Sequence, residues 1–136
     1  MKNSLEQTQA IYEAFGKGDI PSILNALADE VHWEEWENNT AQKAGVPWMK
    51  GGNGKQVAID YFNEIGKLGF KDFRMLSIMA NDHQTAVEYC IELGIPETGK
   101  SYKDEAIHLW TFNDEGKVIR FRHYCDTAKM IEAIRK

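Results

Sequence analysis

The chain has 136 residues, 43% of them hydrophobic, and 16 Lys and Arg against 21 Asp and Glu give a net charge of −5. This length and composition are typical of one folded domain over residues 1–136, and the acidic balance argues against sequence-independent nucleic-acid binding. Because no apolar run approaches the ~20 residues that span a bilayer and residues 1–9 are polar, we expect a cytoplasmic protein without a membrane or nucleic-acid partner.

The first third of the chain places apolar residues at helical spacing. A helix is predicted to begin with Ser4 as its N-cap and to stop at Gly16. Asp19 is the expected cap of a second helix whose buried stripe includes Leu27, and a strand should follow over 31–36. The segment 38–50 is expected to be a loop.

A third helix is predicted from about Asn53 to Gly66 or Gly69, after which the hydrophobic period changes to two. The strands expected there cover 70–80, 84–95, 101–112 and 118–125, and a short helix over 127–134 closes the chain. Helices followed by antiparallel strands predict an α+β fold. A strongly curved sheet around the helices would form a cone whose apolar mouth suits a small molecule.

Signals for metal or cofactor binding are missing. Cys90 and Cys125 have neither the spacing of a metal site nor that of a disulfide framework. The run 51–54 has the glycines of a phosphate loop without the following Lys and Ser or Thr. We therefore expect acid–base chemistry with no cofactor and no metal.

Two histidines lie within apolar strands. His108 shares a strand face with Trp110, and His123 shares one with Phe121. A two-residue turn would pair the two histidines, whereas a three-residue loop would pair His108 with Arg122, and a bulge near the turn would shift either register. Unperturbed histidine titrates near pH 6.5, so a neutral base and a charged donor are both available at pH 7.

Two adjacent carboxylates, Glu34 and Glu35, stand between Trp33 and Trp36. In a strand only one of them can face inward. An inward carboxylate beneath a tryptophan would be desolvated, its pKa would rise, and it could act as a base near neutral pH. A solvated position at the rim is the simpler interpretation of either residue.

Aromatic side chains are expected to shape the wall of a ligand pocket. The predicted wall consists of Trp33, Trp48, Tyr61, Phe62, Tyr89, Trp110 and Phe121. On the opposite sheet face, Arg120, Arg122 and Tyr124 are of the residue types favoured at interfaces, so we expect a homodimer through the outer sheet face.

Several segments resemble the SnoaL-like proteins of the nuclear transport factor 2-like superfamily. They are Gly18-Asp19-Ile20 continuing into residues 27–31, the strand around His108, and the final run 116–126. The resemblance covers essentially the whole chain and implies the cone-shaped fold and a homodimer. The superfamily includes isomerases, polyketide cyclases, dehydratases and non-catalytic binders, so fold alone does not settle the activity.

The resemblance also implies roles for single residues. Glu35 falls where ketosteroid isomerases keep their proton-shuttling Asp, and His108 where they keep the protonated Asp that donates to the oxyanion. Ile11 replaces their oxyanion Tyr, with Tyr12 one residue away, which argues against steroid isomerisation of that kind. His123 matches the acid–base residue of the cyclases. We expect a cofactor-independent enzyme acting on a hydrophobic carbonyl compound, or alternatively a non-catalytic binding or dimeric interaction module.

Overall fold

A six-stranded mixed sheet organises the molecule in the computed structural model, which describes residues 3–34 and 38–136. In chain order the strands are β1 (Leu27–Trp33), β2 (Gly52–Asn53), β3 (Gly69–Ala80), β4 (Gln84–Ile95), β5 (Lys100–Phe112) and β6 (Val118–Tyr124). Their order in the sheet is β2-β1-β6-β5-β4-β3. Every neighbouring pair is antiparallel except β1 and β6, which run parallel.

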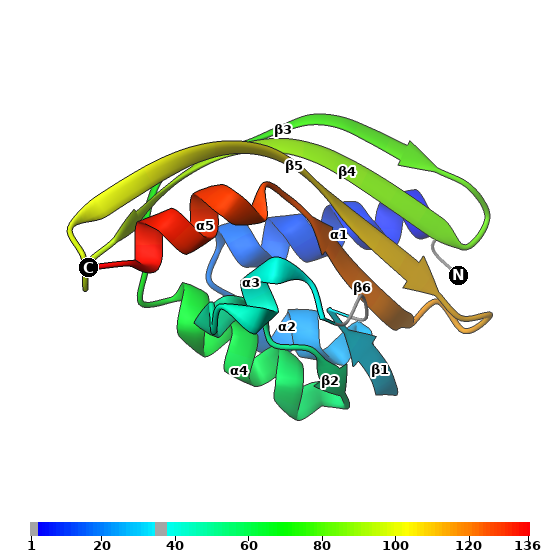
Figure 1. Ribbon diagram of the computed structural model, residues 1–136. Helices are drawn as coiled ribbons and strands as arrows, with labels where there is room; N and C mark the ends of the chain where they lie inside the picture. The colour runs from blue at the N-terminus through cyan, green and yellow to red at the C-terminus, as the bar shows by residue number, and fades with distance from the viewer. Residues whose placement is uncertain (1–2, 35–37) are drawn as a thin grey trace.

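Five α-helices and one 3-10 turn accompany the sheet. They are α1 (Ser4–Gly16), α2 (Ile20–Asn25), α3 (Thr40–Lys43), the 3-10 turn η1 (Pro47–Met49), α4 (Lys55–Ile65) and α5 (Thr127–Ile134). Figure 1 shows the long strands β3, β4 and β5 arching over the helices. This arrangement confirms the expected α+β class. None of the helices within residues 3–34 and 38–136 is long and apolar enough to cross a membrane.

Several details differ from the sequence-based expectations; the strand expected over 31–36 begins at Leu27, and the run 51–54 contains the short strand β2. The N-cap of α1 is Asn3, whose side-chain oxygen accepts from the Glu6 N–H, while Ser4 is the first helical residue and its hydroxyl donates to the Asn81 carbonyl oxygen. Leu27 is buried in β1 rather than in α2, since parallel pairing with β6 begins there. The expected loop over 38–50 contains α3, capped by Asn39, and η1.

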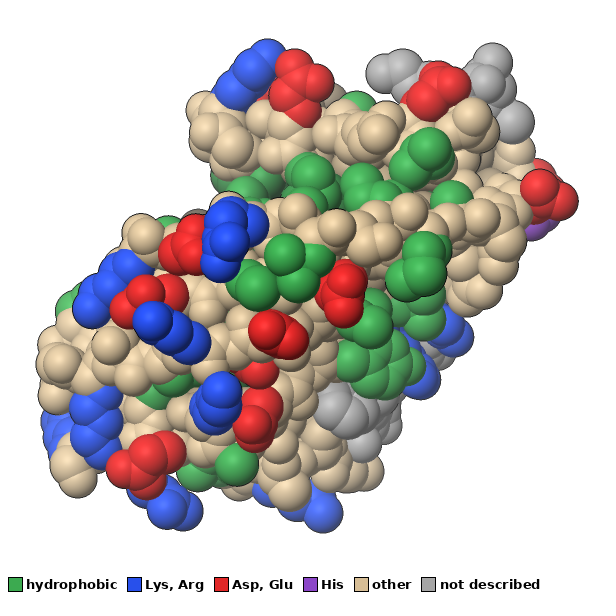
Figure 2. Space-filling model, turned by 90° about the horizontal axis from the view of Figure 1, so that it is seen from above, with side chains coloured by type: hydrophobic (Ala, Val, Ile, Leu, Met, Phe, Trp, Pro, Cys, Tyr) green, Lys and Arg blue, Asp and Glu red, His purple; other side chains and the backbone are tan. Residues whose placement is uncertain are grey.

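The two faces of the sheet differ in character. On β5, every second side chain from Tyr102 to Phe112 is buried against the helices. The side chains between them, such as Ile107, face outward, and Figure 2 shows this outer face with hydrophobic patches among charged side chains. The buried face is the one that forms a cavity.

Candidate functional site

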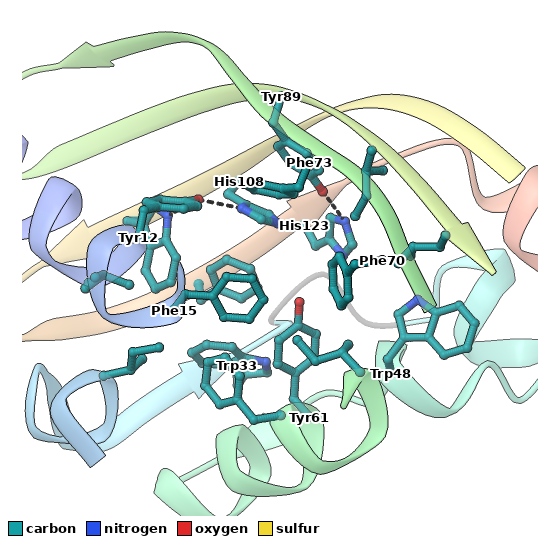
Figure 3. Close-up of a pocket in the computed structure, with 18 residues that line it drawn as sticks. Tyr12, Phe15, Trp33, Trp48, Tyr61, Phe70, Phe73, Tyr89, His108 and His123 are labelled. Carbon is teal, nitrogen blue, oxygen red and sulfur yellow. Dashed lines mark hydrogen bonds between the residues drawn. The ribbon is translucent and has the colours of Figure 1, made fainter. Parts of the chain in front are cut away.

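A cavity of about 60 Å³ lies between the helices and the inner face of the sheet. Among the described residues that line it, eleven side chains are aromatic residues of the Phe, Tyr and Trp types, five are aliphatic and two are histidines. Figure 3 shows this lining. One water occupies ~10–15 Å³ of such a cavity, so there is room for about four to six waters. Together these waters take up roughly the space of one small ring.

All seven residues predicted as the pocket wall line this cavity: Trp33, Trp48, Tyr61, Phe62, Tyr89, Trp110 and Phe121. Their role in ligand binding remains a prediction. Sequence reasoning missed Tyr12 and Phe15 on α1 and Phe70 and Phe73 on β3, which also line the cavity. In the sequence these residues show only the usual spacing of buried helix and strand positions. That spacing does not distinguish a residue that lines a cavity from one that is packed in the hydrophobic core.

The two cavity histidines are directly opposite each other. His108 on β5 pairs with His123 on β6, and their ring centroids lie 5.0 Å apart. Asn113 N–H donates to the Lys117 carbonyl, which leaves a three-residue loop with Gly116 in the left-handed region at φ 80°. That loop alone would pair His108 with Arg122.

A one-residue irregularity in the β5–β6 ladder restores the histidine pair. Phe112 pairs with Val118, whereas Thr111 pairs with Arg120, so Ile119 is the extra residue of a bulge. The bulge moves every later partner by one position. The register that the sequence left open is therefore settled in favour of the histidine pair.

His108 belongs to a short hydrogen-bonded chain with Tyr12 and Trp110. The Trp110 indole Nε1–H donates to the Tyr12 hydroxyl oxygen at 3.1 Å, and this oxygen lies 2.5 Å from His108 Nδ1. An indole can only donate. The buried Tyr12 proton therefore goes to His108 Nδ1, since Tyr12 has no other acceptor among the described residues, and Nε2 of His108 carries the ring proton.

His123 is held by a second tyrosine and by a carboxylate. Its Nε2 lies 2.5 Å from the Tyr89 hydroxyl, and its Nδ1 lies 3.5 Å from Oε1 of Glu34. Tyr89 has no other acceptor among the described residues, so its proton goes to Nε2. The ring proton of His123 is then on Nδ1, which lies near Glu34 without a hydrogen bond among the described residues. The two histidines thus hold opposite tautomers.

Burial sets the protonation states of this network. Desolvation, and then the neighbouring His123, lowers the pKa of His108 well below its usual value of 6.5. Desolvation also raises the pKa of Tyr12 and of Tyr89 well above the usual 10. His108 is therefore neutral at pH 7. Of the two forms that the sequence left open, the neutral imidazole and not the charged imidazolium is the hydrogen-bond donor at this pH.

Of the two adjacent carboxylates, Glu34 is fully buried. Its backbone leaves the strand in a left-handed conformation with φ 52°, which ends the alternation of β1 and brings its side chain to His123. Glu35, the predicted proton-shuttling residue, lies outside the described residues. Within those residues, no group of three or more His, Cys, Asp or Glu side chains is arranged to hold a metal ion.

Comparisons with known proteins support the fold. A family model described as the SnoaL-like domain matches residues 8–121. A nuclear transport factor 2-like protein of unknown function from Burkholderia pseudomallei K96243 is 24% identical, with a TM-score of 0.78 over 100% of both chains.

Two further solved structures share this fold. A candidate polyketide cyclase from Pseudomonas putida KT2440 is 18% identical, with a TM-score of 0.73 over 99% of this chain and 100% of that one. TerC, co-crystallised with polyporic acid, is 20% identical, with a TM-score of 0.74 over 98% of both chains. No curated protein matches the chain.

Proposed function

Because the chain belongs to the SnoaL-like family, we propose that it binds a small apolar carbonyl compound and converts it by acid–base chemistry without a cofactor, as an isomerase, cyclase or dehydratase. The observation that carries this proposal is the pair His108 and His123 inside an aromatic cavity. A positioned proton donor and acceptor contribute roughly 10²–10⁴-fold to such a reaction. The candidate polyketide cyclase with the same fold supports this reaction class.

The tautomers give the two histidines different tasks in this proposal. His108 presents Nε2–H to the cavity and would donate a hydrogen bond to the oxygen of the developing enolate. His123 would take up the proton removed from the carbon next to the carbonyl, and Glu34 at 3.5 Å would stabilise the resulting imidazolium. Glu35 remains a second candidate for the base.

The Tyr89 hydroxyl stands between His123 and a ligand. It donates to Nε2, the only basic nitrogen of that ring. We place Tyr89 as a relay: its oxygen receives the substrate proton while its own proton passes to His123 Nε2. One C–H bond and one O–H bond break while one O–H bond and one N–H bond form, so the protons balance.

Exchange of the protons next to a carbonyl with D₂O tests this proposal. Wild type, His123→Ala and Glu35→Gln are incubated with cyclic ketones and β-keto esters, and the exchange is followed by NMR. His123→Ala is expected to slow exchange at least ~100-fold with ligand affinity retained. The matched control is His83→Ala, since His83 is exposed and pairs with Asp114 away from the cavity. Equal exchange by wild type and His123→Ala would rule out His123 as the proton acceptor.

One observation favours the non-catalytic alternative. Both histidines already accept hydrogen bonds from tyrosines. In a non-catalytic cavity these bonds would only fix the ring positions around a ligand. A binding module would shift its thermal midpoint with a ligand and show no exchange in any variant.

A further inference from the structure

Trp33 carries a polar group that the proposed reaction does not use. Its side chain is fully buried in the cavity wall, and its indole Nε1–H has no hydrogen-bond partner among the described residues. Figure 3 shows the indole nitrogen on the side of the ring that faces Tyr61. A buried donor without a partner is costly and calls for an explanation.

Tyr61 brings a second group to the same wall. Its ring lies 5.3 Å from that of Trp33 between centroids, and Figure 3 shows its hydroxyl pointing across the cavity toward the histidines. No hydrogen bond of this hydroxyl is found in the part of the chain that the structure describes. Burial, and then the charge of Glu34, raises the pKa of Tyr61 well above 10, so the hydroxyl keeps its proton.

The facing wall presents a donor as well. His108 offers Nε2–H, whereas the basic nitrogen of His123 is covered by Tyr89. Phe121 is part of the lining and packs beside both walls, with its ring centroid 4.3 Å from that of Trp33 and 5.1 Å from that of His108. Within residues 3–34 and 38–136, no Lys, Arg, Asp or Glu lines the cavity itself, although buried Glu34 lies 3.5 Å from the lining residue His123. The described lining therefore presents neutral donors on opposite sides.

We propose that Trp33 and Tyr61 form a second hydrogen-bonding subsite across the cavity from the histidines, and that the ligand is a compact uncharged ring with carbonyl-type acceptors at two opposite positions. One oxygen accepts from His108 and the other from Trp33 and Tyr61. The volume of about 60 Å³ suits a single ring of this kind. This inference shares one assumption with the proposed function, namely that the ligand binds in this cavity. It does not depend on the proposed reaction.

A matched pair of probes tests the second subsite. Cyclohexane-1,4-dione and cyclohexanone have the same ring and differ by one acceptor, and their dissociation constants are measured by NMR titration. Wild type is expected to bind the dione about tenfold more tightly than cyclohexanone. The reason is that cyclohexanone leaves one buried donor without an acceptor, and this lowers the affinity by about that factor. Tyr61→Phe should reduce this preference, taken as the ratio of the two dissociation constants, to within about threefold. Tyr124→Phe, which removes a hydroxyl on the outer sheet face, is the control and should keep the full preference.

A second measurement does not depend on a variant's stability. The indole N–H resonance of Trp33, identified by its loss in Trp33→Phe, should shift on adding the dione to wild type and shift less with cyclohexanone. Equal affinities for the two probes, an undiminished preference in Tyr61→Phe, or no binding of either probe would overturn the subsite. Because binding is measured without turnover, a dione preference that survives in an inactive protein would reject the proposed reaction and leave the subsite intact.

Discussion

The low pKa of His108 has a consequence for stability. In the folded chain, burial and His123 hold this pKa well below 6.5, whereas in the unfolded chain it returns to about 6.5. Below pH ~6.5 the unfolded state therefore binds more protons than the folded state at this residue. The free energy of unfolding therefore decreases as the pH falls below the unfolded-state pKa of about 6.5. Above that pH, His108 contributes no pH dependence to the stability.

Replacing His108 should flatten the acid side of the stability profile. We expect the free energy of unfolding of wild type to decrease between about pH 7 and pH 5, with His108 contributing up to ~1.4 kcal/mol per pH unit. His108→Asn removes this contribution, whatever its effect on absolute stability. Urea unfolding at a series of pH values measures the two slopes. Parallel curves for wild type and His108→Asn would contradict the prediction.

Single residues also show where sequence reasoning succeeds and where it stops. Strand alternation was enough to place His108 and Trp110 on one face. It did not predict Tyr12 as a partner of His108, because that contact joins residues 96 positions apart. It also could not choose between Glu34 and Glu35, since the left-handed backbone at Glu34 breaks the alternation on which the choice depends.

At the scale of elements, the β5–β6 hairpin brings the histidines together. Its turn requires Gly116 at φ 80°, a conformation that costs other residues roughly 1–2 kcal/mol. The Asn113 side chain supports the turn by accepting from the backbone N–H groups of Glu115 and Lys117. Beyond the turn, the two strands are joined by a ladder from Phe112 to Ile107.

A side chain at the turn glycine should lower stability without moving the histidines. Gly116→Ala is expected to reduce the free energy of unfolding by about 1–2 kcal/mol, as measured by urea denaturation. Gly16→Ala is the control, because Gly16 ends α1 with a negative φ and has open space around its Cβ position; it should be neutral or slightly stabilising. Histidine NMR signals are expected to be unchanged in Gly116→Ala, and a change in them would show that the turn, rather than the ladder, fixes the register.

The elements themselves were largely predictable. The period-two pattern predicted the strand β4 with its observed bounds, 84–95, and the closing helix α5 was also predicted with its observed bounds, 127–134. Periodicity could not give the His108–His123 register, because that depends on a three-residue loop and a bulge acting in opposite directions. The short helix α3 was missed because four residues show no period, and only its Asn39 cap identifies it.

At the scale of the whole molecule, the outer sheet face has the features of a self-complementary surface. Ile107 is exposed on the central strand β5, with Glu88 beside it on β4 and Tyr124 beside it on β6. Arg122 on β6 lies beside Leu109. Around Ile107 and Leu109, the outer face of β5 therefore has an acidic side chain on one side and a basic one on the other. A two-fold axis along β5 would place β4 of one copy opposite β6 of the other and bring unlike charges together.

We therefore propose that two copies of the chain pack through this face, and Ile107→Lys should separate them. A lysine at the centre would meet its own copy across the axis, and like charges brought together at an interface cost several kcal/mol, whereas an exposed site tolerates lysine in a monomer. Sedimentation equilibrium should give twice the monomer mass for wild type and the monomer mass for Ile107→Lys. Leu5→Lys is the matched control, since Leu5 is equally exposed (36%) but lies on α1, away from this face. The unlike charges also predict weaker association at high salt; a wild type that stays monomeric at every concentration would show that this face does not join two copies.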